Sequence, residues 1–391
     1  MKILLHSDKM KEVEKSGVGR AIVHQQEALK LNHVEYTLNP KDDYDIIHIN
    51  TIFPESYLMG KKAKKLGKKV IFHAHSTEED FRNSFILSNQ VAPLFKTWLK
   101  KLYSSADYII TPTPYSKKLL ENYDLRKPIV AISNGIDLKF YQKGENDRKE
   151  FRERFGFKET DKVIMSVGLF LERKGITEFV ELARRMPEYQ FIWFGYTNLN
   201  TVPSSVKEAV TTKLDNLHFP GYLSREELKK AYFGADLFLF MTHEETEGIV
   251  LLEALACKIP TLIRDIPIYE GWFEDGKNIY KAVTTDEFQD KIKKIVEHQL
   301  PNVTEAGYLE AKKRDIKEIG KQLKEVYEKV MEQEKIKEFS LEDNQIQEQV
   351  RRPVRSRRKP DRIRDIIELL TFHELMRRRN RHREQQRRRY W

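Results

Sequence analysis

The chain of 391 residues is 40% hydrophobic and 11% aromatic, enough apolar material for two or three packed domains, which excludes a largely disordered protein. Its single cysteine excludes an intrachain disulfide. The formal net charge of +10 lies at the C-terminus, because residues 351–391 hold fifteen Arg and one Lys against five acidic side chains and the rest is nearly neutral.

The N-terminus, MKILLHSD, lacks the apolar core of a signal peptide. No stretch reaches the roughly 18 consecutive apolar residues of a membrane span. We therefore expect a cytoplasmic protein whose contact with a membrane is peripheral.

The first part of the chain alternates short apolar runs with amphipathic segments. The runs that predict strands are 2–7, 45–50, 69–75, 108–111 and 129–133. The segments that predict helices are 21–30, 57–67 and 115–123. This alternation indicates a parallel sheet covered on both faces, and we expect a Rossmann-like domain over residues 1–142.

The pattern then restarts and predicts a second Rossmann-like domain over residues 143–335. Its expected strands are 162–168, 189–195, 216–221, 235–241 and 260–264. Its expected helices are 174–186, 224–233, 248–257 and 285–297, with a long closing helix over about 304–335. Ligands of such sheets bind beyond the carboxyl ends of the strands, so the α/β domains should face each other across a cleft. Residues 336–391 form an Arg-rich extension, partly helical or disordered.

Two loops after strands are suited to phosphate. In KSGVGRA (15–21), Gly17 permits close approach of a ligand to the N-terminus of a helix. The dinucleotide fingerprint is incomplete, since Ile22 stands where its third glycine belongs, which disfavours a nicotinamide enzyme. In SVGLFLERKG (166–175), Arg173 and Lys174 could clamp a diphosphate. A tight turn and a solvated basic turn are the structural alternatives.

VIFHAHSTEEDF (70–81) places His73 and His75 on the same side of a strand. Zinc needs further ligands, which this pattern does not supply convincingly, and we expect no metal site. A histidine at the carboxyl end of a strand is better placed to hydrogen-bond a sugar hydroxyl.

In THEETEGIVLLEALA (242–256), Glu245 and Glu253 lie on either side of Gly248. Thr242 and Glu245 fit a capping box. Glu253 stands in a strongly apolar helix, where a carboxylate is costly without a partner; the vicinal hydroxyls of a ribose would provide one. From the spacing alone, a capped helix and a binding site remain equally good interpretations.

In this order, these motifs resemble the GT-B-fold retaining nucleotide-sugar glycosyltransferases of family four, whose E-x7-E hallmark is matched by Glu245 and Glu253. The resemblance covers roughly residues 1–333. Its other matches are Ser16-Gly17, His75, Asn134-Gly135-Ile136-Asp137, Arg173-Lys174-Gly175 and the segment 219–228. The chain departs from the family at Leu169, where an arginine is usual, and at Ser16, where a glycine is usual. Glu247 is left unexplained.

The resemblance implies a role for each matching residue. Glu253 would hold the ribose of the donor, while Glu245 and His75, as the catalytic residues, would orient the transferred sugar and stabilise charge. The remaining donor-binding residues would be Gly17, Gly248, Ile249, Val250, Arg173 and Lys174 at the diphosphate or sugar and Tyr222 at the uracil. A UDP-sugar would be the donor substrate, and no cofactor would be obligatory.

KSGVGRAIVHQ, DIIHINT and HAHSTEEDFRNSF resemble a narrower group, the glycolipid synthases of Gram-positive bacteria that add a second hexose to monoglucosyl-diacylglycerol, building the anchor of lipoteichoic acid. This implies transfer of glucose or galactose from a UDP-hexose, with retention, at the inner face of the cell membrane. The alternative acceptors are diacylglycerol itself and a polyprenyl-linked or soluble glycan. A nucleic-acid-binding protein acting through the Arg-rich tail is an alternative of another class.

VAPLFKTWLKKLY (91–103) has an apolar stripe that includes Trp98 and Leu99, beside Lys100 and Lys101. Such a helix suits the surface of an anionic membrane, but an ordinary helix packed on the core has the same pattern. The Arg-rich tail could bind phospholipid headgroups or nucleic-acid phosphate without sequence preference. We expect the membrane, and no specific nucleic acid, as its partner; the oligomeric state is not indicated.

Overall fold

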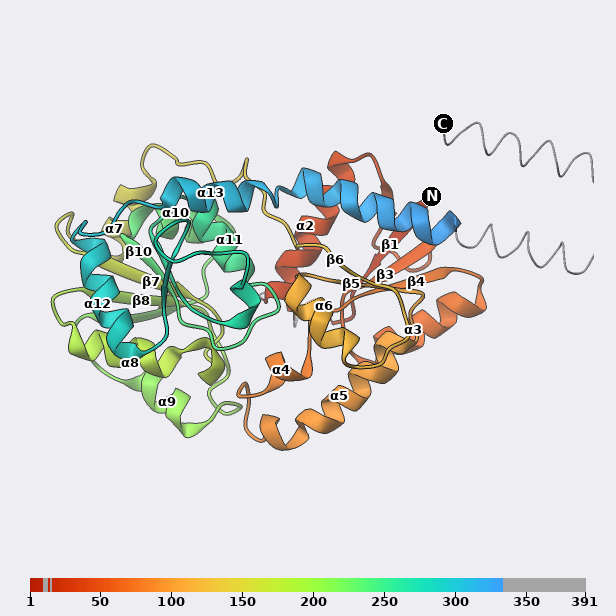
Figure 1. Cartoon of the computed structure of the whole chain (residues 1–391), viewed down its shortest axis with the longest axis horizontal. Helices are drawn as coiled ribbons and strands as arrows, with labels where there is room; N and C mark the ends of the chain where they lie inside the picture. The colour runs from red at the N-terminus through yellow and green to blue at the C-terminus, as the bar shows by residue number, and fades with distance from the viewer. Residues whose placement is uncertain (10–12, 15, 333–391) are drawn as a thin grey trace, which may run out of the picture. The chain divides into compact units, whose positions relative to one another are not determined.

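The computed structural model describes residues 1–9, 13–14 and 16–332. The expectations for the extension, residues 336–391, lie outside the described residues. Two six-stranded parallel sheets form the frame, with strand orders β2-β1-β3-β4-β5-β6 and β12-β11-β10-β7-β8-β9. The α/β fold predicted from the sequence, with two Rossmann-like halves, is therefore confirmed (Figure 1).

The first sheet contains β1 (Lys2–His6), β2 (Glu35–Thr37), β3 (Ile46–Ile49), β4 (Lys69–His73), β5 (Tyr108–Thr111) and β6 (Ile129–Ala131). Its helices are α2 (Gly17–Leu31), α3 (Pro54–Lys65), α4 (Glu78–Phe81), α5 (Ser88–Ser104) and α6 (Pro114–Glu121). Consecutive residues of β3 serve opposite faces, since Ile46 packs in one core cluster and Ile47 in another. Burial on both faces explains why these strands appear in the sequence as continuous apolar runs.

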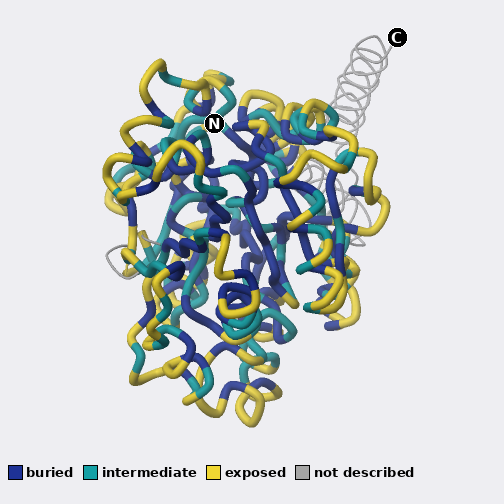
Figure 2. Tube along the Cα trace, turned by 90° about the vertical axis from the view of Figure 1, so that its left-hand side faces the viewer, coloured by how far each residue is buried: buried dark blue, intermediate teal, exposed yellow. Residues whose placement is uncertain are grey.

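The second sheet contains β7 (Val163–Val167), β8 (Gln190–Phe194), β9 (Leu217–Gly221), β10 (Leu237–Phe240), β11 (Thr261–Arg264) and β12 (Tyr280–Ala282). Its helices are α7 (Asp147–Phe155), α8 (Ile176–Arg185), α9 (Ser204–Thr211), α10 (Arg225–Gly234), α11 (Ile249–Ala256), α12 (Thr285–Val296) and α13 (Thr304–Lys312), with short 3-10 turns η1 (Glu172–Lys174) and η2 (Pro267–Tyr269). In Figure 2 the buried strands lie inside, and the exposed residues gather on loops and outer helix faces.

The chain crosses back to the first sheet after α13. The predicted continuous helix over 304–335 is interrupted, because Asp315 forms a bridge with Ile136 and a new helix runs over 316–332. That helix contributes Ile319, Leu323 and Tyr327 to the core cluster of β1. It passes α2 so closely that a Cβ added to Gly320 would lie 2.3 Å from the carbonyl oxygen of Ala28. The crossing therefore ties the end of the described chain to the first sheet.

Candidate active site

A cavity of about 680 Å³ lies between the two halves, at the carboxyl ends of both sheets. Every residue predicted to contact the donor or its sugar lines this cavity: Gly17, His75, Arg173, Lys174, Tyr222, Glu245, Gly248, Ile249, Val250 and Glu253. The structure thus brings together residues from segments that are far apart in the sequence. Their individual roles remain predictions.

Glu245 lies in a loop and not at the start of a helix. Helix α11 begins at Ile249, and Gly248 precedes it without a side-chain cap, which excludes the alternative that Thr242 and Glu245 form a capping box. The Glu245 carboxylate instead pairs with the ammonium group of Lys174. Burial lowers the pKa of Lys174, and the charge of Glu245 opposes that shift. The first glutamate of the motif is thus held by a cation on the facing loop.

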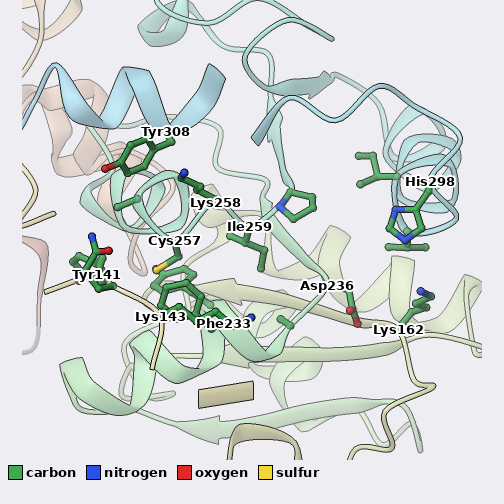
Figure 3. A pocket seen from close by; sticks show the side chains of 17 residues that line it. Tyr141, Lys143, Lys162, Phe233, Asp236, Cys257, Lys258, Ile259, His298 and Tyr308 are labelled. Carbon is green, nitrogen blue, oxygen red and sulfur yellow. The ribbon is translucent and has the colours of Figure 1, made fainter. Parts of the chain in front are cut away.

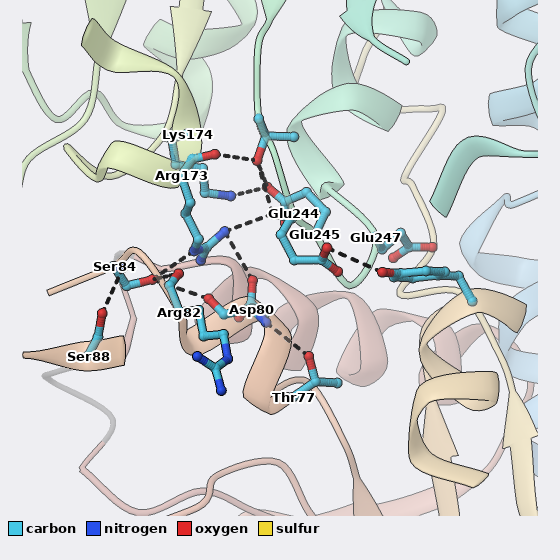
Figure 4. A network of polar contacts seen from close by, with 12 residues as sticks. Thr77, Asp80, Arg82, Ser84, Ser88, Arg173, Lys174, Glu244, Glu245 and Glu247 are labelled. Atoms are coloured by element: carbon cyan, nitrogen blue, oxygen red, sulfur yellow. Dashed lines mark hydrogen bonds and ion pairs between the residues drawn. The ribbon is translucent and has the colours of Figure 1, made fainter. Parts of the chain in front are cut away.

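Arg173 binds the two halves together. Its guanidinium donates to Ser84 Oγ at 2.9 Å and to the carbonyl oxygen of Glu244 at 3.0 Å, and it pairs with Asp80 at 3.0 Å. Figure 4 shows this network reaching from the segment around α4 to the loop after β10. The predicted phosphate ligand therefore already has several protein partners.

Glu253 is only 1% exposed, and it has the partners that its burial demands. The hydroxyl of Tyr232 donates to its Oε2 at 3.0 Å. Its Oε1 lies 3.5 Å from Nε of Arg20, which comes from α2 of the first half. The sequence reasoning did not select Arg20 or Tyr232, although Arg20 stands inside the KSGVGRA motif.

Two helix N-termini face the cavity. Gly17 begins α2, and a Cβ added there would meet nothing within 4 Å. Gly248 precedes α11 with φ of 84°, and a Cβ there would meet the Phe240 ring at 3.1 Å. The free N–H groups of such helix ends favour anions. Gly17, Ile249 and Val250 thus lie at helix N-termini that line the cavity, and their contact with a phosphate stays a prediction.

His75 ends a buried chain of polar side chains. Its Nε2 lies 3.0 Å from Oδ1 of Asn50. Its ring stacks on His73 with centroids 4.1 Å apart, His73 stacks on His48, and His48 Nδ1 lies 2.7 Å from the Tyr327 hydroxyl. Burial lowers the pKa of His75 to about 3. The ring is therefore neutral near pH 7 and interacts through hydrogen bonds.

Glu247, which the motif left unexplained, is 1% exposed and lines the cavity. Its Oε2 accepts hydrogen bonds from the backbone N–H and the side-chain Nδ2 of Asn134. Burial raises the pKa of Glu247 to about 7, against the lowering effects of Ser133, Asn134 and Arg314. Glu247 therefore fastens the loop before α11 to the segment after β6.

The predicted membrane-binding residues divide into two groups. Leu99 is fully buried in the core, so its assignment to the membrane surface is wrong: the apolar stripe at this end of α5 packs inward. Trp98 packs against the same core and donates from Nε1 to the carbonyl oxygen of Ile52 at 2.8 Å. Lys100 and Lys101 are exposed.

A different part of the α5 region is apolar and exposed. It consists of Phe85, Ile86, Leu87, Val91 and Leu94, which are 38 to 73% exposed, and we call it the 85–94 patch. The patch adjoins the cleft, since Ile86 donates its backbone N–H to Thr201 in the second half. Among the described helices, none is long and apolar enough to cross a bilayer.

A second cavity, of about 540 Å³, lies at the other end of α11 (Figure 3). Tyr141, Lys143, Lys258 and Tyr308 are among its lining residues. None of the residues predicted from the motifs lines it. Nor do the described residues contain a group of three or more His, Cys, Asp or Glu side chains placed to hold a metal ion.

Comparisons with known families agree with this geometry. The family described as Glycosyltransferase Family 4 matches residues 29–140, and the family of Glycosyl transferases group 1 matches residues 147–323. The Anabaena protein HepE, solved in complex with UDP and glucose, superimposes with a TM-score of 0.68 at 16% identity. The match covers 84% of this chain and 100% of HepE.

Two relatives are lipid glycosyltransferases by name. The processive diacylglycerol alpha-glucosyltransferase of Acholeplasma laidlawii is 42% identical over 334 residues, covering 85% of this chain and 99% of the relative. The alpha-galactosylglucosyldiacylglycerol synthase of Streptococcus pneumoniae is 24% identical over 273 residues, covering 68% of this chain and 73% of the relative. The resemblance inferred from the motifs is confirmed: the chain belongs to the group 1 glycosyltransferases and has their GT-B fold.

Proposed function

We propose that this glycosyltransferase moves a hexose from a UDP-sugar to a diacylglycerol lipid, with retention at the anomeric carbon. The observation that carries the proposal is the placement of Glu245 and Glu253 in one cavity, each with a cation from a facing element. The 42% identity to a diacylglycerol glucosyltransferase favours glucose as the transferred sugar. That relative is named processive, so both diacylglycerol and monoglucosyl-diacylglycerol are proposed acceptors.

In this proposal Glu253 accepts hydrogen bonds from the ribose hydroxyls, and Glu245 orients the transferred hexose. The leaving diphosphate lies between the N-termini of α2 and α11, where N–H groups and cations stabilise the charge that develops. Lys174 pairs with Glu245, and the His75 ring, whose pKa is lowered by burial, is uncharged near pH 7. Glu245 and His75 are assigned to orienting the sugar and stabilising charge, and neither is assigned the role of a covalent nucleophile.

Contact with the membrane is assigned to the 85–94 patch. Exposed apolar clusters of this kind occur at membrane and protein interaction sites. The patch lies beside the cleft through the bond from Ile86 to Thr201, so a lipid held there would present its headgroup near the donor. Lys100 and Lys101 would add attraction to an anionic surface. The enzyme would then act as a peripheral protein at the inner face of the membrane.

The test is an incubation of the full chain with radiolabelled UDP-glucose or UDP-galactose and vesicles that contain either diacylglycerol or its monoglucoside. Labelled glycolipid from UDP-glucose is expected with both acceptors. Hydrolysis of the product by an α-glucosidase but not by a β-glucosidase is the expected sign of retention. Labelled soluble glycan in the absence of labelled lipid would contradict the proposal.

A further inference from the structure

The charges around the cavity raise a question about how it accepts a diphosphate. Among the described residues, three cationic side chains line it together with five carboxylates: Arg20, Arg173 and Lys174, and Glu14, Asp80, Glu245, Glu247 and Glu253. A nucleoside diphosphate adds further negative charge. At least one cation must therefore have donors that can turn to the phosphates.

Two of the three cations are already committed to protein partners. Arg173 has its ion pair with Asp80 and two hydrogen bonds, to Ser84 and Glu244. Lys174 has a close contact with Glu245. If the Arg173 side chain turned to a phosphate, the network that joins the two halves would break. Arg173 is therefore poorly placed to bind the diphosphate.

Arg20 differs from both. Among the described residues, its side chain has a single charged partner, Glu253, with 3.5 Å between Nε and Oε1. A guanidinium carries five N–H donors in a rigid fork that matches phosphate oxygens. The side chain is 18% exposed and lines the cavity. Most of its donors are thus available to a ligand inside the cavity.

The position of Arg20 on α2 places this charge next to an existing anion site. The residue lies one helical turn after Gly17, whose backbone lines the cavity at the start of the helix. On the facing side, Gly248 precedes α11, and Ile249 and Val250 begin it. A phosphate between the two helix ends would meet Arg20 from the first half and N–H groups from both halves.

We infer that Arg20 binds the diphosphate of the donor and that Glu253 holds its side chain in position for this purpose. One carboxylate would then serve two groups, the ribose hydroxyls and the arginine that meets the phosphates. This inference rests on the proposed use of a UDP-sugar. The family usually has an arginine at the position of Leu169. In this chain Arg20, from the first half, would supply that positive charge instead.

If Arg20 contacts the diphosphate and not the nucleoside, its substitution should change the affinity for UDP but not that for uridine. We would measure the affinities of uridine and UDP by calorimetry for the full chain and for Arg20→Gln and Arg20→Lys. Arg20→Gln should weaken UDP about tenfold or more, because a charged hydrogen bond is lost. It should change uridine less than about twofold. Arg20→Lys keeps the positive charge but not the planar set of N–H donors. Its UDP affinity should lie between that of the parent and that of Arg20→Gln.

Arg225→Gln is the matched control. Arg225 pairs with Asp137 at 3.4 Å and is 19% exposed, close to the values for Arg20, but it does not line the cavity. It should leave both affinities unchanged. If Arg20→Gln weakens uridine and UDP equally, Arg20 only supports the ribose site and the inference is wrong. If the unmodified chain binds uridine but not UDP, the proposed function itself fails.

Discussion

Glu247 and Asn134 join the two halves of the enzyme across the cavity. The backbone N–H of Asn134 and its Nδ2 both donate to Oε2 of Glu247, at 2.9 and 2.8 Å. The other carboxylate oxygen, Oε1, is buried and has no hydrogen-bond partner among the described residues. Burial of the carboxyl raises its pKa to about 7, although the two hydrogen bonds from Asn134 favour the ionised form.

Stability should therefore depend on the ionisation of Glu247. Between the ordinary pKa of 4.5 and about 7, the folded protein keeps a proton that the unfolded chain has lost. This group therefore lowers the free energy of unfolding as the pH rises through that window. Above pH 7 the full cost is of the order of 3 kcal/mol. Glu247→Gln cannot ionise at this position. At pH 8 it should unfold at a higher urea concentration than the parent, and at pH 5 the two should unfold at similar urea concentrations.

Burial also raises the pKa of Glu244 to about 7, but Glu244 titrates in parent and variant alike and cancels from the difference. Glu247→Ala serves as the control, because it loses both hydrogen bonds from Asn134 and should be less stable than Glu247→Gln at either pH. A difference between parent and Glu247→Gln that does not change with pH would contradict the raised pKa.

Substitution of the two glutamates of the motif, Glu245 and Glu253, should have different effects on binding and on catalysis. Glu253→Gln loses the carboxylate assigned to the ribose and should weaken both uridine and UDP by about tenfold. Glu245→Gln should leave uridine binding unchanged and lower kcat, because Glu245 is assigned to the transferred hexose. Calorimetry and steady-state kinetics measure the two effects. Equal losses of uridine affinity in both variants would show that the assigned roles are not separate.

The 85–94 patch should govern attachment to lipid. Leu94 is 73% exposed, so the substitution Leu94→Glu removes no side chain from the core. It should weaken co-sedimentation with anionic vesicles and leave the melting temperature and the UDP affinity unchanged. Leu309→Glu is the matched control, since Leu309 is 50% exposed but lies on α13 in the second half. Equal sedimentation of Leu94→Glu and the parent would refute the assignment.

Gly320 should be required for the crossing helix. An added methyl group would lie 2.3 Å from the Ala28 carbonyl oxygen in α2, so the helix over 316–332 would have to shift. Gly320→Ala should lower the free energy of unfolding by about 1–3 kcal/mol. Gly17→Ala also adds a methyl group at a helical glycine, but into open space, and should leave the melting temperature unchanged or slightly higher. Similar melting of Gly320→Ala and the parent would contradict the close approach.

The sequence predicted the central strands well because most of them are buried on both faces and therefore consist of apolar runs. It missed the edge strands β2 and β12, whose sequences EYT and YKA are too short and polar to stand out. The stripe containing Leu99 had the periodicity of an amphipathic helix, but periodicity does not tell whether the apolar side faces a core or a membrane.

The residues selected from the sequence for the donor site belong to contiguous motifs, and all of them line the cavity. The partners that hold them were not predicted, since the pairs Arg20–Glu253, Tyr232–Glu253 and Asn134–Glu247 join segments distant in the chain. Only folding brings these side chains together. A buried carboxylate in an apolar helix signals that a partner exists but does not identify it.

The most direct test of the central claim is a comparison of hexose transfer with UDP-glucose by the parent and by Glu245→Gln, using vesicles that contain diacylglycerol. The account predicts labelled glucosyl-diacylglycerol with the parent and a loss of about a hundredfold or more in kcat for the variant, since an interaction with the reacting sugar is removed. No labelled lipid from the parent, or equal rates for the two proteins, would contradict it.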